Sequence, residues 1–247
     1  MSGHSKWSTI KHKKGAADAA RGKVFTKHAK LIEIAAREGG GSDPTMNAAL
    51  KAAIDNAKAE NVPNANIDRA VKKGSGELKG DATVGVIYEA YAPGGTALII
   101  ECLTDNKNRT LPNVRTIIEK RGGKMAESGS VMFLFTQKGV IQTQGTMNDD
   151  LELALIDAGA EDIEVNDDGI SITTDVNTWT TARDTLKTAG HTIQEAGMRF
   201  VPLQEINIED LESAQKLMDL LEAIEEEEDV SDVHTNADIS DEIANQL

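Results

Sequence analysis

The residues best suited to chemistry lie at the start of the chain, where lysines surround a tryptophan. Residues 1–30 hold eight Lys and Arg against one acid, Asp18. Such cations neutralise phosphates and release their counterions, and the indole of Trp7 offers a surface on which an unpaired base can stack. This combination predicts nucleic-acid binding, and the competing interpretation is a solvated arm without a partner. The residues expected to make the contact are Lys6, Trp7, Lys11, His12, Lys13, Lys14, Arg21, Lys23, Lys27 and Lys30.

Charge is distributed unevenly between the two ends of the chain. The whole chain has a formal net charge of -15, which by itself argues against a nucleic-acid binder. Residues 1–80, however, hold 15 Lys and Arg against 8 Asp and Glu, whereas the remainder holds 11 against 33. An asymmetry of this kind indicates an anionic partner on the basic side. The acidic part is expected to repel nucleic acid, which confines the contact to the N-terminus, or to recruit a protein partner.

DNA and RNA are both possible partners of this basic segment. The second predicted helix carries only Lys51 and Lys58 and no Arg that could recognise guanine edges, so no helix-turn-helix is evident. Residues 1–15 are expected to form an arm without fixed structure of its own. A lysine-rich arm with one aromatic suits backbone binding or structured RNA at least as well as sequence-specific reading of a duplex. The residues alone therefore lean slightly toward RNA.

A second candidate site follows a predicted strand and precedes a predicted helix. Free backbone N–H groups at that helix start, together with Lys107 and Arg109, could hold a phosphate. The alternative is a capped turn, in which Asp105 or Asn106 satisfies the helix start. The residues of this possible phosphate-binding loop are Asp105, Asn106, Lys107, Asn108 and Arg109.

Other chemistry finds little support in the residue pattern. No nucleophile–His–carboxylate arrangement and no phosphate-loop motif is present, so we expect no enzymatic activity and no cofactor. A Cu(II) or Ni(II) site at Ser2-Gly3-His4 is conceivable but is expected to be incidental, and Cys102 is expected to be a small core residue. The histidines His4, His12, His28, His191 and His234 otherwise show no spacing typical of metal ligands.

Features that the sequence lacks indicate the compartment of the protein and whether it contacts a membrane. No apolar run is long enough to span a bilayer, and no apolar segment with a cleavage site follows the basic N-terminus. The single cysteine excludes an intramolecular disulfide and fits a reducing compartment. We therefore expect a cytoplasmic protein with no membrane partner.

Three helices are predicted to position the basic residues. The first runs from Ala16 to Glu38, the second opens at Asp43-Pro44, and the third follows Pro63 and stops at Gly74. Met46 is expected in the apolar stripe of the second helix. In the first helix the apolar face comprises Val24, Phe25, His28, Leu31, Ile32 and Ala35. The opposite face is expected to present Lys23, Lys27, Lys30 and Arg37 to a partner.

From Asp81 onward the apolar residues recur with the period of β-strands. Val84–Tyr91 and Thr96–Leu103 are predicted to form a hairpin through Pro93-Gly94-Gly95, followed by a helix that ends near Arg121. A strand–helix–strand–strand–helix–strand pattern, typical of a ferredoxin-like domain, comes next. Its predicted pieces are Phe133–Thr143, Asn148–Ala158, Asp162–Val165, Ile170–Thr173, Val176–Ala189 and Thr192–Phe200.

The last elements of the chain have no partner nearby in the sequence. A helix at Glu209–Ile224 and a strand at Val230–Thr235 are expected to return to the sheet that begins at Val84. The expected fold is therefore α+β with three domains. Residues 1–80 form a basic arm and a three-helix domain, residues 81–133 and 206–247 a discontinuous α/β domain, and residues 134–205 an inserted ferredoxin-like domain.

Two blocks of residues resemble a known family. The first is Gly3-His4-Ser5-Lys6-Trp7, followed by Ile10-Lys11-His12-Lys13-Lys14, Asp18 and Arg21-Gly22-Lys23. The second comprises Tyr88-Glu89, Pro93-Gly94-Gly95 and Leu103-Thr104-Asp105-Asn106-Lys107-Asn108-Arg109. On these residues the chain resembles the YebC/PmpR family. The resemblance implies a helical first domain and a ferredoxin-like third domain inserted in the second.

The resemblance also implies a function. Bacterial members of that family are described as cytoplasmic DNA-binding transcriptional regulators, and others, including a mitochondrial translational activator, look like ribosome-associated translation factors. The expectation is therefore a non-enzymatic regulator of gene expression, in the first place a DNA-binding transcriptional regulator. The alternative is a translation factor that binds ribosomal RNA.

Overall fold

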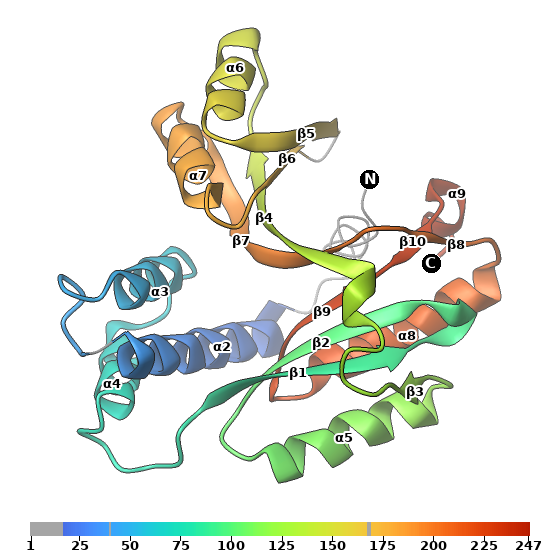
Figure 1. Ribbon diagram of the computed structural model, residues 1–247, viewed down its shortest axis with the longest axis horizontal. Coiled ribbons are helices and arrows are strands. Elements are labelled where there is room, and N and C mark those ends of the chain that lie inside the picture. Colours follow the sequence, from blue (N-terminus) through green and yellow to red (C-terminus); the bar gives the residue numbers. More distant parts are fainter. Residues whose placement is uncertain (1–16, 40, 167–168) are drawn as a thin grey trace.

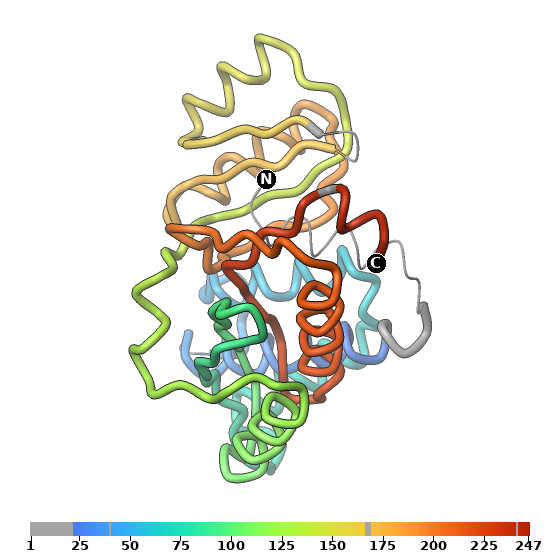
Figure 2. The backbone as a smooth tube through the Cα atoms, turned by 90° about the vertical axis from the view of Figure 1, so that its right-hand side faces the viewer, coloured from blue at the N-terminus to red at the C-terminus, as the bar shows by residue number. Residues whose placement is uncertain are grey.

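The computed structural model describes residues 17–39, 41–166 and 169–247. Within these residues lie a helical domain, a middle domain built on a four-stranded sheet and a third domain built on a second four-stranded sheet (Figure 1). Figure 2 places the third domain at the top, above the other two. The predicted α+β class with three domains is confirmed, whereas the residue limits suggested for the domains stay a prediction.

The helical domain consists of α2 (Ala17–Glu38), α3 (Ala48–Ala59) and α4 (Asn64–Gly74). These helices bury a small aliphatic core that comprises Ile32, Ala36, Leu50, Ala57, Val62, Ile67 and Ala70. No aromatic residue is among these buried side chains, in keeping with an aromatic content of only 3%. The three-helix arrangement predicted for this part of the chain is present.

The second of these helices begins later than the sequence suggests. Asp43 and Pro44 were expected to open it, but α3 begins after Asn47, whose side chain accepts the N–H of Leu50 at 3.0 Å. Asp43 instead accepts from the N–H and the hydroxyl of Thr45, at 2.9 and 2.7 Å. Because a short polar side chain binds the nearest free backbone donor, Asp43 closes a turn and Asn47 caps the helix.

Two side chains expected in apolar faces are exposed. Met46 is 85% exposed because it lies in the turn before α3, and Leu31 is 37% exposed. Helix α2 packs on two sides, with Ile32 toward α3 and α4 and Lys30 toward the middle domain. At about 100° per residue, Leu31 falls between these two contact surfaces.

The middle domain is built on an antiparallel sheet in the order β3-β1-β2-β9. Its strands are β1 (Val84–Tyr91), β2 (Ala97–Thr104), β3 (Lys124–Met125) and β9 (Val230–Thr235). The turn η1 (Pro93–Gly95) joins β1 to β2. The predicted hairpin and the predicted return of the last strand to this sheet are both confirmed.

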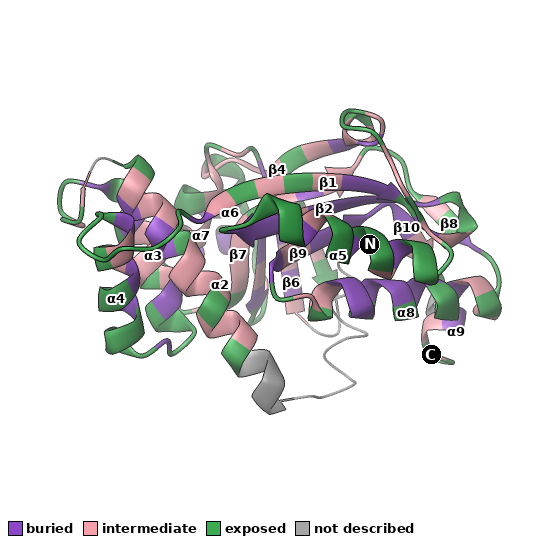
Figure 3. Ribbon diagram, turned by 90° about the horizontal axis from the view of Figure 1, so that it is seen from below, coloured by how far each residue is buried: buried purple, intermediate pink, exposed green. Residues whose placement is uncertain are grey.

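Helices α5 (Lys107–Lys120) and α8 (Leu211–Glu226) cover one face of this sheet. The core beneath them includes Leu98, Ile100, Cys102, Val114, Ile118, Leu217, Leu220 and Ile224. Figure 3 shows buried residues on the inner side of α8 and exposed residues on the outer side of α5. Within the described part of the chain, no helix is both long and apolar enough to cross a membrane.

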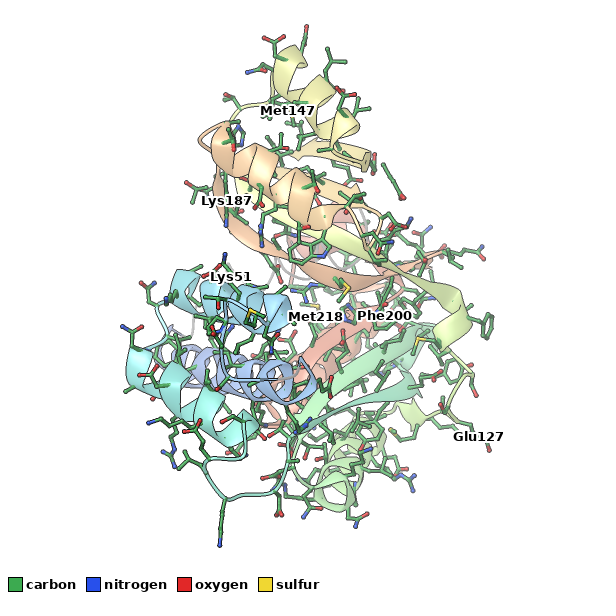
Figure 4. All side chains as sticks on the ribbon, turned by 60° about the vertical axis from the view of Figure 1, so that its left-hand side comes forward. Lys51, Glu127, Met147, Lys187, Phe200 and Met218 are labelled. Atoms are coloured by element: carbon green, nitrogen blue, oxygen red, sulfur yellow. The ribbon has the colours of Figure 1, made fainter. Side chains whose placement is uncertain are left out.

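The other face of the sheet meets the third domain. A separate cluster of buried residues joins the two and comprises Ala97, Ile99, Val131, Phe135 and Phe200. The ring of Phe200 (Figure 4) lies edge-on to that of His234, with 5.4 Å between the ring centres. A short parallel pair that the sequence did not predict, β8 (Ile206–Ile208) and β10 (Ala237–Ile239), extends the middle domain, and α9 (Asp241–Ala244) follows it.

The third domain has the predicted ferredoxin-like order of elements. These are β4 (Phe135–Gln144), α6 (Asp149–Asp157), β5 (Ala160–Asn166), β6 (Gly169–Thr174), α7 (Trp179–Thr188) and β7 (Thr192–Pro202). The strands pair antiparallel in the order β5-β6-β4-β7. Both helices cover one face, over a core that contains Ile141, Leu155, Ile172 and Leu186.

Two element starts in this domain differ from the prediction. The first strand was expected from Phe133, but η2 (Met132–Leu134) forms a short turn there and Phe133 is 68% exposed. Strand β4 begins only where its pairing with Pro202 of β7 begins. The second helix was expected from Val176, but the side chain of Asp175 accepts the N–H of Asn177 at 3.0 Å, and this turn delays α7.

Candidate nucleic-acid interface

The structure describes three of the ten side chains predicted to contact nucleic acid. Lys6, Trp7, Lys11, His12, Lys13, Lys14 and the side chain of Arg21 lie outside the described residues. Lys23, Lys27 and Lys30 lie on α2. Because they are spaced by four and three residues, they share one side of the helix.

Lys23 contacts the C-terminal end of another helix. Its Nζ donates to the backbone carbonyl of Glu227 at 2.7 Å. Glu227 follows the last turn of α8, where unpaired carbonyls carry partial negative charge. A lysine at this position is favourable, and it fixes the beginning of α2 to the segment 227–232, here called the acidic segment.

Lys27 and Lys30 bind carboxylates of the same acidic segment. The Nζ of Lys30 lies 2.9 Å from Oδ1 of Asp229, and that of Lys27 lies 3.6 Å from Oδ2 of Asp232. The side chain of Lys30 is only 19% exposed and that of Lys27 only 33% exposed. The acidic segment holds these lysines in the structure, and their contact with nucleic acid stays a prediction.

Asp229 is the centre of this contact. It is 3% exposed and accepts from Lys30, from Nη2 of Arg109 at 2.8 Å, and from the hydroxyls of Thr110 and Thr104 at 2.8 and 3.2 Å. Burial raises the pKa of this carboxyl, but the bonds from Arg109, Lys30 and Thr110 outweigh burial and hold the pKa at about 2. The carboxylate thus ties α2 to the start of α5 and the end of β2.

The second predicted site, the loop 105–109, is a capped turn. Asn106 accepts the N–H of Arg109 through its side chain, at 3.2 Å, which confirms the alternative that the sequence left open. The guanidinium of Arg109 is held by Asp105 at 3.1 Å and by Asp229. A phosphate-binding role for this loop stays a prediction. Its remaining members, Lys107 and Asn108, are exposed in the first turn of α5.

A cluster of possible metal ligands lies where the domains meet. The ligand atoms of Glu101, Asp232 and His234 lie within 4.8 Å of one another, with Nε2 of His234 2.7 Å from Glu101. Glu101 and Asp232 are direct partners on β2 and β9, where like charges repel. Arg199 of β7 and Lys27 both form ion pairs with Asp232. Since these cations already compensate the carboxylates, we describe the cluster as an ionic junction and assign it no metal. Sequence spacing could not reveal it because strand pairing brings its members together.

Two further features of the described residues, Cys102 and a pocket beside α6 and α7, do not suit nucleophilic or phosphate chemistry. Cys102 is buried as predicted, and burial raises the pKa of its thiol to about 12, so little reactive thiolate forms. A pocket of about 720 Å³ lies between α6 and α7. Its lining contains Asp150 and Asp184 and no lysine or arginine, so it would repel a phosphate.

Comparisons with known proteins agree along the whole chain. Residues 5–77 match the family described as TACO1/YebC protein N-terminal domain, and residues 83–237 match the one described as TACO1/YebC second and third domain. A probable transcriptional regulatory protein of Thermobifida fusca (strain YX) is 47% identical over 246 residues, which cover 98% of both chains. One from Halothermothrix orenii is 42% identical over 251 residues and covers 100% of this chain and 99% of its own.

A solved structure supports the same relationship. The crystal structure of a conserved hypothetical protein from Aquifex aeolicus has a TM-score of 0.84 and 39% sequence identity. The match covers 92% of this chain and 93% of that one. The arrangement of domains described above therefore recurs in a second protein.

Proposed function

The chain belongs to the TACO1/YebC family, and we propose that it is a nucleic-acid-binding regulator of gene expression without catalytic activity. The observation that carries the proposal is the composition of residues 1–16, which contain four lysines and Trp7 but no acid. The names of its relatives, probable transcriptional regulatory proteins, support the regulatory part of the proposal.

The contacts of α2 reduce the set of residues proposed to bind nucleic acid. Lys23, Lys27 and Lys30 are held by the acidic segment, so binding rests on the cations that precede them in the chain. The strong negative charge of residues 81–247 disfavours phosphate over much of the remaining surface. Nucleic acid is thereby directed to the N-terminal end of the chain.

The first candidate target is DNA, since the relatives are named for transcription. The second is ribosomal RNA, and Trp7 favours it because an indole stacks on unpaired bases that duplex DNA does not offer. Crosslinking in cells followed by sequencing of the attached nucleic acid separates the two. Promoter fragments would identify a transcriptional regulator, and ribosomal RNA a translation factor.

Binding itself is tested with the full chain and four substitutions, Lys6→Gln, Lys11→Gln, Lys13→Gln and Lys14→Gln. Each neutralised phosphate contact contributes about 0.9 to the slope of log K against log salt on duplex DNA. We expect the slope to fall by about 3.6 and the affinity near 100 mM salt to fall more than tenfold. A matched control removes four exposed lysines of the helical domain through Lys51→Gln, Lys58→Gln, Lys72→Gln and Lys79→Gln. Equal affinities for the two variants at low salt would overturn the proposal.

A further inference from the structure

The acidic part of the chain contains one concentrated group of cations. Residues 81–247 hold eleven Lys and Arg against 33 acids, yet six of those eleven lie between residues 107 and 124. This stretch contains one acid, Glu119, and Asp105 lies just before it. It coincides with α5 and the edge strand β3.

The charges of this group are largely uncompensated. Arg109 is paired with Asp105 and Asp229, but the other five form no ion pair with any described residue. All five are exposed, and we call them the α5 cations: Lys107, Arg115, Lys120, Arg121 and Lys124. In a region with three times as many acids as bases, unpaired cations would be expected to be rare.

The neighbouring helix makes the absence of pairing more informative. Helix α8 packs beside α5 over the same sheet face and carries the exposed acids Glu212, Asp219, Glu222 and Glu226. Among described residues the α5 cations make no ion pair with these acids. A hydrogen bond does run from Nδ2 of Asn113 on α5 to Glu227, which follows α8, at 3.2 Å. The α5 cations therefore offer their charge to solvent.

Helix stability explains only part of this arrangement. Cations at a helix C-terminus interact favourably with the macrodipole, which accounts for Lys120 and Arg121. Lys107 stands in the first turn, where the macrodipole opposes a cation, and Arg115 lies in the middle of the helix. Their presence points to a use outside the helix.

We propose that the exposed side of α5 and β3 is a second contact for the phosphodiester backbone of a nucleic acid. This inference rests on the proposed function. Helix α5 has 14 residues and is about 21 Å long, a length over which a duplex carries about twelve phosphates. Because Asp229 joins Lys30 to Arg109, α5 begins where α2 is anchored, and the two cationic elements keep a fixed relation.

The test compares two full-length variants that lose the same charge. One carries Arg115→Gln, Lys120→Gln and Lys124→Gln, and its control carries Lys138→Gln, Lys187→Gln and Lys216→Gln, which remove the remaining lysines of residues 81–247 outside the group. Lys138 and Lys216 are paired with Glu161 and Glu212, and Lys187 (Figure 4) extends from α7. The probes are a 30-base-pair DNA duplex and a 30-nucleotide single-stranded RNA, each titrated at several salt concentrations.

For the α5 variant we expect an affinity at least tenfold below that of the control near 100 mM salt. The salt slope should fall by about 2.7 on the duplex or about 2.1 on the single strand. A loss on one probe alone identifies which backbone the surface binds. Binding equal to that of the control on both probes overturns the inference. If the wild-type chain binds neither probe at low salt, the proposed function fails as well. If the α5 variant binds as well as its control while the variant with four N-terminal Lys→Gln substitutions binds more weakly, only the inference about α5 is overturned.

Discussion

Three buried carboxylates each hold a connecting segment to a structural element. Glu33, Glu89 and Asp229 are 3–4% exposed. Glu33 accepts from the N–H and hydroxyl of Thr83 at 2.8 and 2.9 Å, just before β1, and Glu89 accepts three N–H groups from the segment 129–132. Because a buried charge without partners is costly, these carboxylates specify where each segment must lie.

Asp229 offers the sharpest test of this idea. Replacing it with Asn removes the charge that binds Lys30 and Arg109 while keeping the size of the side chain. A pKa of about 2, against an ordinary value of 3.8, corresponds to roughly 2 kcal/mol of stability. We expect Asp229→Asn to lower the free energy of unfolding by about that amount at pH 7, measured with urea. Asp219→Asn, an exposed change on α8, should alter it by less than about 0.5 kcal/mol.

The loss of stability caused by Asp229→Asn should depend on pH. Since the pKa of Asp229 is depressed in the folded state, its contribution is complete above about pH 5 and is lost progressively as the pH falls toward 2. The difference between wild type and Asp229→Asn should therefore shrink between pH 5 and pH 3. A difference that stayed constant over this range would show that the charge is not the cause.

Glu89 should matter through its geometry as an acceptor. Burial raises its pKa, but the N–H groups of Gly129, Val131 and Met132, at 2.6, 2.6 and 2.9 Å, bring it below the ordinary value. In Glu89→Gln the amide nitrogen cannot accept, so at least one of these three N–H groups loses its partner. We expect a loss of about 1–3 kcal/mol and faster hydrogen exchange at these three amides. Unchanged exchange would contradict this role, and Glu127→Gln, at an exposed position (Figure 4), is the control.

At the scale of elements, Asn47 and Asp43 are the two candidates for the N-cap of α3. Asn47 caps the helix and also donates from Nδ2 to the carbonyls of Ala35 and Gly41, at 2.9 and 3.1 Å. The carboxylate of Asp43, the cap suggested by sequence, accepts exposed hydrogen bonds from Thr45. We expect Asn47→Ala to lower stability by about 1–2 kcal/mol and Asp43→Ala by less than about 0.5 kcal/mol. Thermal unfolding of the two variants decides, and the reverse order would contradict the assignment.

Elements with a clear period could be predicted, whereas those made by pairing alone could not. The alternating pattern of Val84–Tyr91 and the helical stripes around Leu50 and Leu217 carry their own periodicity. Strands β3, β8 and β10 have two or three residues each, too few to show an alternation. Their existence depends on partners elsewhere in the fold, such as the pairing of Ile206 with Ala237.

The candidate site, too, could be predicted from the sequence only in part. The helical angle places Lys23, Lys27 and Lys30 on one side of α2, and this could be computed from spacing alone. Their partners in the acidic segment lie about 200 residues later, and no periodicity reports a contact over that distance. The sequence therefore indicates where the cations lie on the helix but not which groups they bind.

At the scale of the whole molecule, charge decides from which side a nucleic acid can approach. On the proposed function, the N-terminal residues and the α5 cations would attract phosphate, while the acids on the outer side of α8 would repel it. Such repulsion acts mainly on the rate of encounter and is screened by salt, since the Debye length is about 10 Å at 0.1 M. The acids of α8 should thus restrict productive orientations and contribute little to the final contact.

Neutralising the acids of α8 should have an effect opposite in sign to that of the lysine variants. Asp219→Asn, Glu222→Gln and Glu226→Gln together remove three negative charges from exposed positions on α8. We expect the association rate with duplex DNA to rise roughly three- to tenfold at 50 mM salt, with little change in the dissociation rate. At 0.5 M salt the rates of variant and wild type should converge, because screening removes the repulsion. Stopped-flow fluorescence measures both conditions, and an increase that persisted at high salt would mean that these acids touch the nucleic acid directly.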